Sequence, residues 1–216
     1  MRQYLGWLGH DSYRTLHRNV WWMGWNLVLA LVPAVLGVLL FHRPHRHRLV
    51  WWAGVAVFIA FLPNAPYVAT DLVHLPDAVA ATQMRGTVIV ALLPIFTAFV
   101  AVGFACYAVA LTEAVGALRR GGYARWTAPA EVLAHLAAAV GVLLGRVIRL
   151  NSWTPLAHPR VSADRAAALL AEPQALVVVI ALAAGFGLAH HVVTRVGRAA
   201  AGWAGPRLAA GGHPAA

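Results

Sequence analysis

Long apolar stretches separated by short polar ones dominate the chain. Five of these stretches come close to the ~20 residues that a helix needs to cross the hydrocarbon core of a bilayer. They cover residues 21–41, 49–62, 87–112, 130–150 and 174–195. The pattern predicts an all-α integral membrane helical bundle of about five transmembrane helices, with a short Pro-broken helix after the second span.

The predicted domain organisation is a single unit between two tails. One transmembrane helical domain covers residues 21–196. An N-terminal tail of residues 1–20 precedes it, and a Gly/Pro-rich, flexible C-terminal tail of residues 197–216 follows. Tryptophans crowd the ends of the apolar runs, as they do at membrane–water interfaces.

Composition and charge agree with a membrane location. The chain is 61% hydrophobic and 11% charged, whereas soluble domains are about 45–50% apolar and about 25% charged. All 17 basic residues are arginines, and the formal net charge is +10. Because the arginines lie between apolar runs, anionic lipid headgroups are the expected partners and nucleic acid is not. The lone Cys106 excludes an intrachain disulfide.

Five alternating spans divide the polar segments between two faces. Face A collects residues 1–20, 63–86 and 150–173, and face B collects residues 42–48, 119–125 and the C-terminal tail. Nine arginines against six favour face B as the cytoplasmic side.

The stretch FLPNAPYVATDLVHL, residues 61–75, interrupts the apolar pattern. Pro63 lacks an N–H group and clashes with the preceding turn, so the second helix is expected to break there. Asn64 can then cap a new helix by accepting from a backbone N–H group. At the spacing i, i+4 and i+7, one face of that helix carries three polar side chains: Tyr67, Asp71 and His74. The alternative is a helix that simply ends among the headgroups.

The fourth apolar run carries a stripe of ionisable side chains. At ~100° per residue, four of them lie within roughly 60° of one another: Glu131, His135, Arg146 and Arg149. Such residues usually face the bundle interior or a water-filled cavity, although arginines at a helix end can also snorkel to the headgroups. Glu131 and His135 lie ~20 Å nearer face B than the two arginines do, at a rise of 1.5 Å per residue. Structural hydrogen bonding with His190, His191 or Glu113 is expected there.

The second and fourth helices both end at face A, so their polar stretches are predicted to meet. Asp71 is placed at the depth to pair with Arg146 or Arg149, with Asn64 and Asn151 close by. Two guanidinium groups against one carboxylate leave a positive charge unmatched. That excess charge indicates an anionic ligand.

Two motifs are long and unusual: LPNAPYVATDLVHL and LGRVIRLNSW. With their spacing and the apolar pattern over residues 20–196, they resemble the paired signatures of an uncharacterised bacterial multi-pass membrane family, domain of unknown function 1361. The resemblance implies a membrane bundle in the bacterial cytoplasmic (inner) membrane and supplies no activity. The family pattern usually has an acidic residue where this chain has Thr154, and an aromatic–Asp pair that the loop after the first motif lacks.

The interpretation that we favour is a polar site at one membrane face. It would hold an anionic small ligand or a lipid headgroup through charged, amide and aromatic side chains: Asn64, Tyr67, Arg146, Arg149, Asn151 and Trp153. If the site is catalytic, His74 held by Asp71 would be its general base. Ser152 would be the candidate nucleophile.

Other interpretations use the same residues. A metal site could combine Asp71 and His74 with Asp77 or His158, but two adjacent arginines oppose a cation. Phosphate-loop, dinucleotide and zinc motifs are absent from the sequence, so no metal or cofactor is predicted. The alternative function is a non-catalytic membrane scaffold or transporter subunit, in which Asp71 only ties helices together. Whether the protein is an enzyme, and its oligomeric state, stay open at this point.

Overall fold

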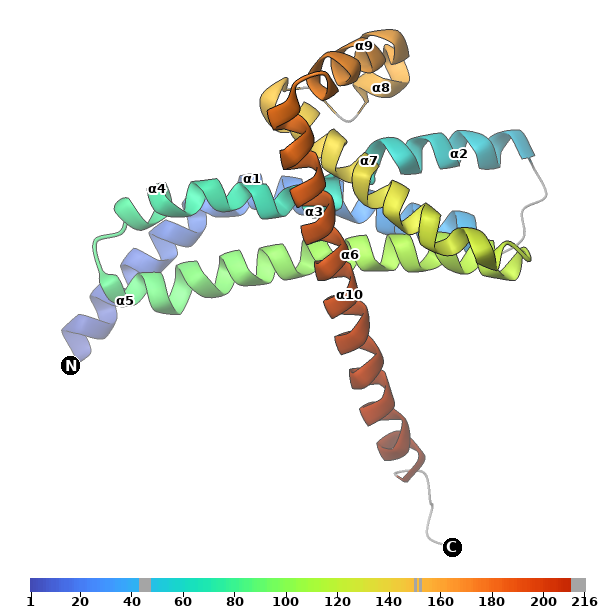
Figure 1. Cartoon of the computed structure of the whole chain (residues 1–216). Coiled ribbons are helices and arrows are strands. Elements are labelled where there is room, and N and C mark those ends of the chain that lie inside the picture. Colours follow the sequence, from blue (N-terminus) through green and yellow to red (C-terminus); the bar gives the residue numbers. More distant parts are fainter. Residues whose placement is uncertain (43–47, 150, 152, 211–216) are drawn as a thin grey trace, which may run out of the picture.

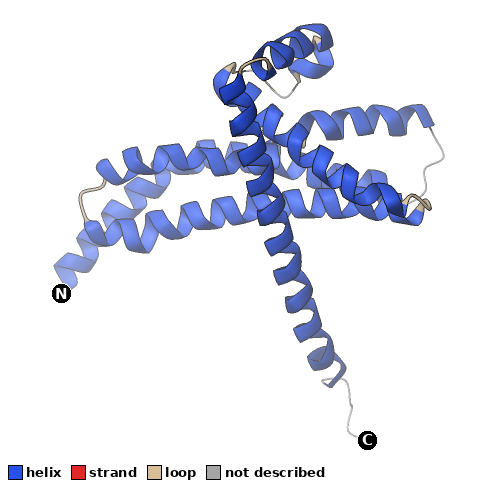
Figure 2. Cartoon of the chain, viewed as in Figure 1, coloured by secondary structure: helices blue, strands red, loops and turns tan. Residues whose placement is uncertain are grey.

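The computed structural model describes residues 1–42, 48–149, 151 and 153–210, and these residues form helices without a strand (Figure 2). Five helical segments in this part of the chain are long and apolar enough to cross a membrane: Arg2–Phe41, Arg48–Ala80, Arg85–Arg120, Ala124–Val147 and Pro173–Gly202. The predicted all-α membrane bundle is therefore confirmed.

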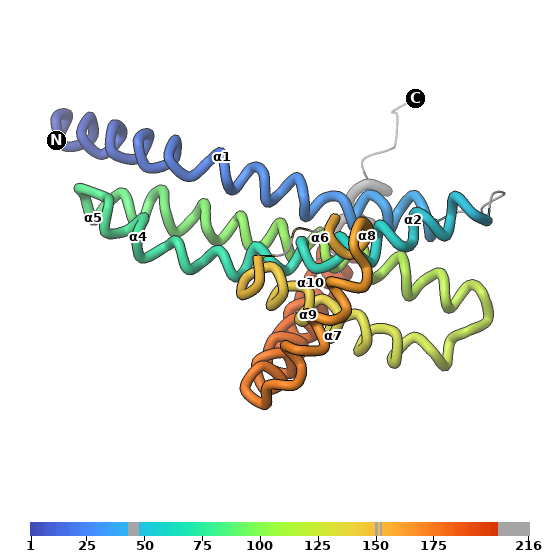
Figure 3. The backbone as a smooth tube through the Cα atoms, turned by 90° about the horizontal axis from the view of Figure 1, so that it is seen from above, coloured from blue at the N-terminus to red at the C-terminus, as the bar shows by residue number. Residues whose placement is uncertain are grey.

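The first long segment is a single helix, and the second and third each contain several joined elements. Helix α1 is Arg2–Phe41, and the second segment comprises α2 (Arg48–Phe61), α3 (Asn64–Tyr67), the 3₁₀ helix η1 (Val68–His74) and α4 (Leu75–Ala80). The third comprises α5 (Arg85–Thr87), the π-helical turn η2 (Val88–Leu92) and α6 (Leu93–Arg120). These three segments lie alongside one another in Figures 1 and 3.

The remaining helices cover one side of this layer. The 3₁₀ turn η3 (Ala124–Trp126) leads into α7 (Thr127–Val147), and the short α8 (Thr154–Ala157) and α9 (Pro159–Leu170) form a hairpin. Helix α10 (Pro173–Ala210) packs on α7 and crosses α6 (Figure 1).

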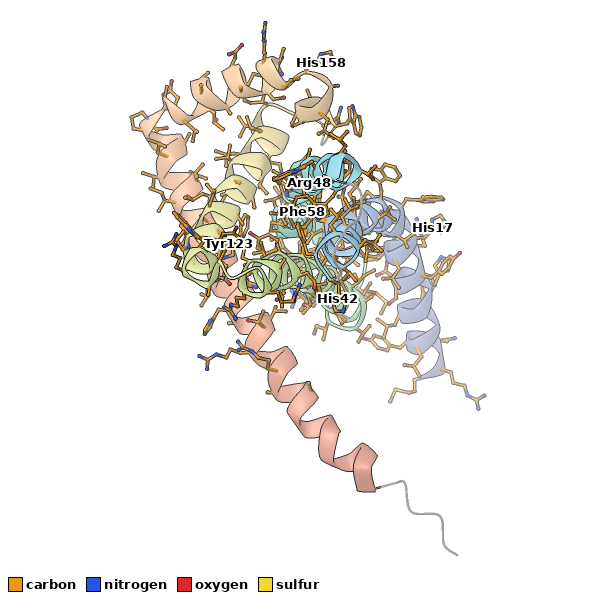
Figure 4. All side chains as sticks on the ribbon, turned by 90° about the vertical axis from the view of Figure 1, so that its right-hand side faces the viewer. His17, His42, Arg48, Phe58, Tyr123 and His158 are labelled. Atoms are coloured by element: carbon orange, nitrogen blue, oxygen red, sulfur yellow. The ribbon has the colours of Figure 1, made fainter. Side chains whose placement is uncertain are left out.

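The core lies where α1, α3, α6 and α7 meet. Its fully buried side chains are small on three of these helices, with Ala30, Ala65 and Ala138 as examples, and large on α6, which supplies Phe96 and Tyr107. Figure 4 shows Phe58 of α2 at the packed centre, whereas His17 and His158 lie on the outside. Small residues let the helix backbones approach closely, which is how membrane helices gain packing energy.

Two glycines make the closest approaches. A Cβ atom on Gly103 of α6 would collide with Val68 and lie 2.8 Å from the carbonyl oxygen of Ala65. A Cβ atom on Gly141 of α7 would collide with the ring of Pro63. The helix break at Pro63 therefore contacts α7 directly, and this contact fixes the position of the second span relative to α7.

The break at Pro63 is as predicted, but the role of Asn64 is not. Helix α2 ends at Phe61, and α3 begins at Asn64 itself, so Asn64 lies inside the new helix and Pro63 is its N-cap. The Asn64 side chain donates to the carbonyl oxygen of Phe61 at 2.9 Å and so satisfies an acceptor at the end of α2.

Residues 2–20, assigned to a tail from their polar composition, form the first half of α1. Asp11 is buried there, and its carboxylate accepts from Thr87 Oγ1 at 2.8 Å and from the backbone N–H of Met84 at 3.1 Å. These groups begin the 85–120 helical segment. A side chain of α1 thus caps another helix, where N–H groups lack partners. At the other end of the chain, α10 continues to Ala210.

We predict that Asp11→Ala destabilises the protein by about 1–3 kcal/mol, the cost of leaving buried donors unsatisfied. Asp164→Ala, an exposed acidic position on α9, is the matched control and should change stability by less than about 0.5 kcal/mol. Unfolding of the purified full chain in detergent measures both. Equal losses in the two variants would contradict the capping role of Asp11.

Candidate functional site

The expected meeting of the second and fourth spans is present as an ion pair. Arg146 Nη2 lies 2.9 Å from Asp71 Oδ1, and the same nitrogen donates to the carbonyl oxygen of Thr70. Asp71 is 2% exposed. Its other oxygen accepts from Asn26 Nδ2 of α1 at 2.7 Å. Both carboxylate oxygens are therefore bonded, as the burial of a charge requires.

Tyr67 completes this cluster. The guanidinium carbon of Arg146 lies 5.0 Å from the centre of the Tyr67 ring, a distance at which a cation is attracted to the aromatic face. The cluster of Asn26, Tyr67, Asp71 and Arg146 joins α1, α3, η1 and α7. We call it the central wall, because two of its residues, Asn26 and Tyr67, line both of the cavities described below.

The first cavity, the polar cavity, has a volume of about 510 Å³. Asp71, His74 and Asp77 line it from η1 and α4, and Arg146 lines it from α7. On the α1 side it is lined by Thr15, Arg18, Asn19, Trp22 and Asn26.

The sequence interpretation did not include the residues that α1 contributes to the lining of the polar cavity. Thr15, Asn19, Trp22 and Asn26 fall at i, i+4, i+7 and i+11, a helical spacing that places them on one face. The Trp22 indole donates to Asn19 Oδ1 at 3.2 Å, and Asn19 Nδ2 donates to the carbonyl oxygen of Thr15 at 2.8 Å. A search of residues 1–20 for polar side chains at helical spacing would have found this row of residues, because it continues into the first apolar run.

His74 is placed differently from its predicted role. Because η1 is a 3₁₀ helix with three residues per turn, Val68, Asp71 and His74 share one face, on which the first two are buried and His74 is exposed. The His74 ring lies 5.1 Å from that of Trp22. Both oxygens of Asp71 are bonded to Arg146 and Asn26, and no bond between Asp71 and His74 occurs among the described residues. His74 thus lines the cavity without being held as a general base by Asp71.

The second cavity, the apolar groove, has a volume of about 670 Å³. Trp25 and Leu29 of α1, Ile59 of α2, and Leu133, Val140 and Leu144 of α7 line most of its length. Asn64, Arg149, Asn151 and Trp153 also line it. Asn26 and Tyr67 line both cavities. The structure thus distributes the predicted site residues over two neighbouring cavities that share Asn26 and Tyr67 of the central wall.

Arg149 leaves the stripe on which it was predicted. Helix α7 ends at Val147, two residues before Arg149, whose backbone has φ 56°. This left-handed conformation, uncommon for a residue with a side chain, turns the chain away from the helix axis. Arg149 is exposed and has no carboxylate within salt-bridge distance among the described residues. Only Arg146 therefore pairs with Asp71.

The polar residues nearer face B form two separate groups. His135 is buried and its Nδ1 lies 2.8 Å from the hydroxyl oxygen of Tyr107, with the His190 ring 5.6 Å away. His135 is thus hydrogen-bonded, but among the described residues its partner is Tyr107 and not the expected His190, His191 or Glu113. Glu113 pairs with His42 at 3.3 Å and Arg120 at 3.8 Å.

Metal-ligand geometry is not found in the described part of the chain, which has no group of three or more His, Cys, Asp or Glu side chains able to hold an ion. Ser152, the candidate nucleophile, lies outside the described residues.

Residues 25–187 match the model of the family described as "Protein of unknown function (DUF1361)". The match covers most of the chain, including the central wall and both cavities' lining on α3, η1 and α7. The chain therefore belongs to this family. Neither a curated protein nor a solved structure matches it.

Substitutions of Arg146 and of Arg149 should differ in their effect on the free energy of unfolding. We predict that Arg146→Gln destabilises the protein by about 3 kcal/mol, because buried Asp71 loses its cation. This value is the lower end of the destabilisation expected when one partner of a buried ion pair is removed, because the Arg146 side chain is 33% exposed. Arg149→Gln should cost less than about 0.5 kcal/mol. Unfolding in detergent compares the two, and a larger loss at Arg149 would contradict this assignment.

Proposed function

We propose that this protein is a multi-pass protein of the bacterial inner membrane that binds an anionic lipid in the apolar groove. The headgroup would meet Arg149, with Asn64, Asn151 and Trp153 beside it. The acyl chain would lie along α7. The observation that carries the proposal is the lining of the groove, in which Arg149 is the single charged residue among the described ones.

The distribution of polarity along the groove supports an amphiphile. From Leu133 to the end of α7 at Val147 the helix rises roughly 20 Å at 1.5 Å per residue. The groove residues of α7 in this stretch are apolar, whereas Arg149, Asn151 and Trp153 follow the end of the helix. Asn26, Asn64 and Tyr67 line the groove from α1 and α3. Ligand cavities of about 300–1,000 Å³ commonly combine apolar walls with a few polar groups that fix orientation.

Access from the bilayer also supports a lipid. Trp25, Ile59 and Leu133 line the groove and are more than half exposed. In a membrane, such side chains face acyl chains, so a lipid can enter sideways without crossing water. A soluble anion would not require these apolar walls.

The charge balance assigns the anion to Arg149 rather than Arg146. Asp71 already neutralises Arg146, whereas an exposed Arg149 can form charge-assisted hydrogen bonds with a phosphate. The ion pair itself fits the alternative function, a scaffold whose polar residues tie helices together. Binding at Arg149 is what distinguishes the proposed function from that alternative.

Lipid binding to the full chain in detergent micelles tests the proposal, with native mass spectrometry as the readout. We predict that phosphatidylglycerol binds and that phosphatidylcholine with the same acyl chains binds about 10-fold more weakly. Arg149→Gln should weaken phosphatidylglycerol binding about 10-fold or more, since a hydrogen bond to a charged group is worth about 1.5–3 kcal/mol. Ala137→Trp should also weaken it, because Ala137 is an exposed residue of the groove.

The control is Arg160→Gln, which removes an exposed arginine of α9 outside the groove lining and should leave binding unchanged. Equal binding of the two lipids, or equal losses at positions 149 and 160, would overturn the proposal. Displacement of the lipid by millimolar inorganic phosphate would identify a small anion as the ligand instead.

A further inference from the structure

The polar cavity contains groups that the lipid proposal does not use. Of the described residues that line it, Ala78 and Ala81 are the ones whose side chains can neither form a hydrogen bond nor carry a charge. Ionisable and amide side chains inside a membrane bundle are costly unless partners compensate them. Asn19, Trp22 and Asn26 on this face of α1 have protein partners, so the groups of the cavity that lack one are the candidates for binding a ligand.

Among the described residues, four buried side-chain atoms lack a hydrogen-bond partner, and one of them, Thr15 Oγ1, belongs to a residue that lines this cavity. Thr15 is 2% exposed and lines the cavity, and its Oγ1 has no hydrogen-bond partner among the described residues. Such orphaned buried groups are rare in proteins and indicate a bound water or ligand. The Thr15 hydroxyl group in the cavity lining is thus able to form a hydrogen bond with a bound molecule.

The charges of the cavity are of two kinds. Asp71 and Arg146 neutralise each other within the central wall. Arg18 and Asp77, both exposed, form no ion pair with each other or with another described side chain. Arg18 is nevertheless positioned, because its Nη2 donates to the carbonyl oxygen of Ala81 at 3.3 Å. Among the described residues, the cavity therefore offers a cation, Arg18, and an anion, Asp77, that are not in an ion pair.

Aromatic rings add a surface that suits a cationic group. Trp22 and Tyr67 line the cavity from α1 and α3, and His74 packs at 5.1 Å from Trp22. A ligand cation beside Asp77 can lie against an aromatic face, an attraction of about 0.5–1 kcal/mol at exposed sites.

We propose that the polar cavity is a second ligand site, which binds a small water-soluble zwitterion. Its anionic group would bind Arg18, and its cationic group would bind Asp77 beside the aromatic rings. A hydrogen-bonding group would meet Thr15. The site is independent of the lipid site, with which it shares only Asn26 and Tyr67 of the central wall.

Three matched probes test the requirement for both charges: 4-aminobutyrate, butyrate and butylamine. Binding to the purified full chain in detergent is measured by saturation-transfer NMR and titration. We expect 4-aminobutyrate to bind at least about 10-fold more tightly than either single-charge probe. Arg18→Gln and Asp77→Asn should each weaken it about 10-fold, as expected for the loss of one charge-assisted contact.

The matched control is Arg14→Gln, an exposed arginine of α1 that does not line the cavity and should not change probe binding. Arg149→Gln should likewise leave 4-aminobutyrate binding unchanged while weakening lipid binding, so failure of one proposal is distinguishable from failure of the other. Equal binding of butyrate and 4-aminobutyrate would overturn the zwitterion assignment. So would a loss in Arg14→Gln, or the absence of 4-aminobutyrate binding at about 10 mM.

Discussion

A buried carboxylate, Asp71, is the constraint on which the arrangement of the bundle depends. A charge inside an apolar bundle is tolerated only when it is paired and its remaining oxygen is bonded. Arg146 supplies the charge and Asn26 the second bond, so α1, η1 and α7 must stay in register at this point. The Pro63–Gly141 contact permits the approach, because no Cβ atom stands between the proline ring and α7. The central wall follows from these requirements.

The two cavities that share residues of the central wall also differ in the chemistry of their lining. Because Asp71 is paired with Arg146, the arginine without a carboxylate partner is Arg149, which lines the apolar groove beyond the end of α7. In the polar cavity, α1 presents hydroxyl, amide and charged groups. One surface is therefore suited to an amphiphile and the other to a polar solute. This difference is the reason for assigning them separate ligands.

Sequence reasoning predicted the parts that depend on local periodicity and on the cost of buried charge. The five spans, the break at Pro63 and the pairing of Asp71 with Arg146 follow from such rules and are present. The first half of α1 was missed, because its polar side chains resemble a solvated tail until Asp11 is seen to cap the 85–120 segment. Likewise, no local rule separates Arg149 from the stripe of Arg146, since the left-handed turn depends on how α7 ends.

The coupling energy between Asp71 and Arg146 tests the central wall most directly. It is obtained from the unfolding free energies in detergent of the wild type, Asp71→Asn, Arg146→Gln and the double variant. If the two side chains act as one unit, the double variant is less destabilised than the sum of the single ones, by at least about 1 kcal/mol. Additive losses within about 0.3 kcal/mol would contradict the account, because the two residues would then contribute independently.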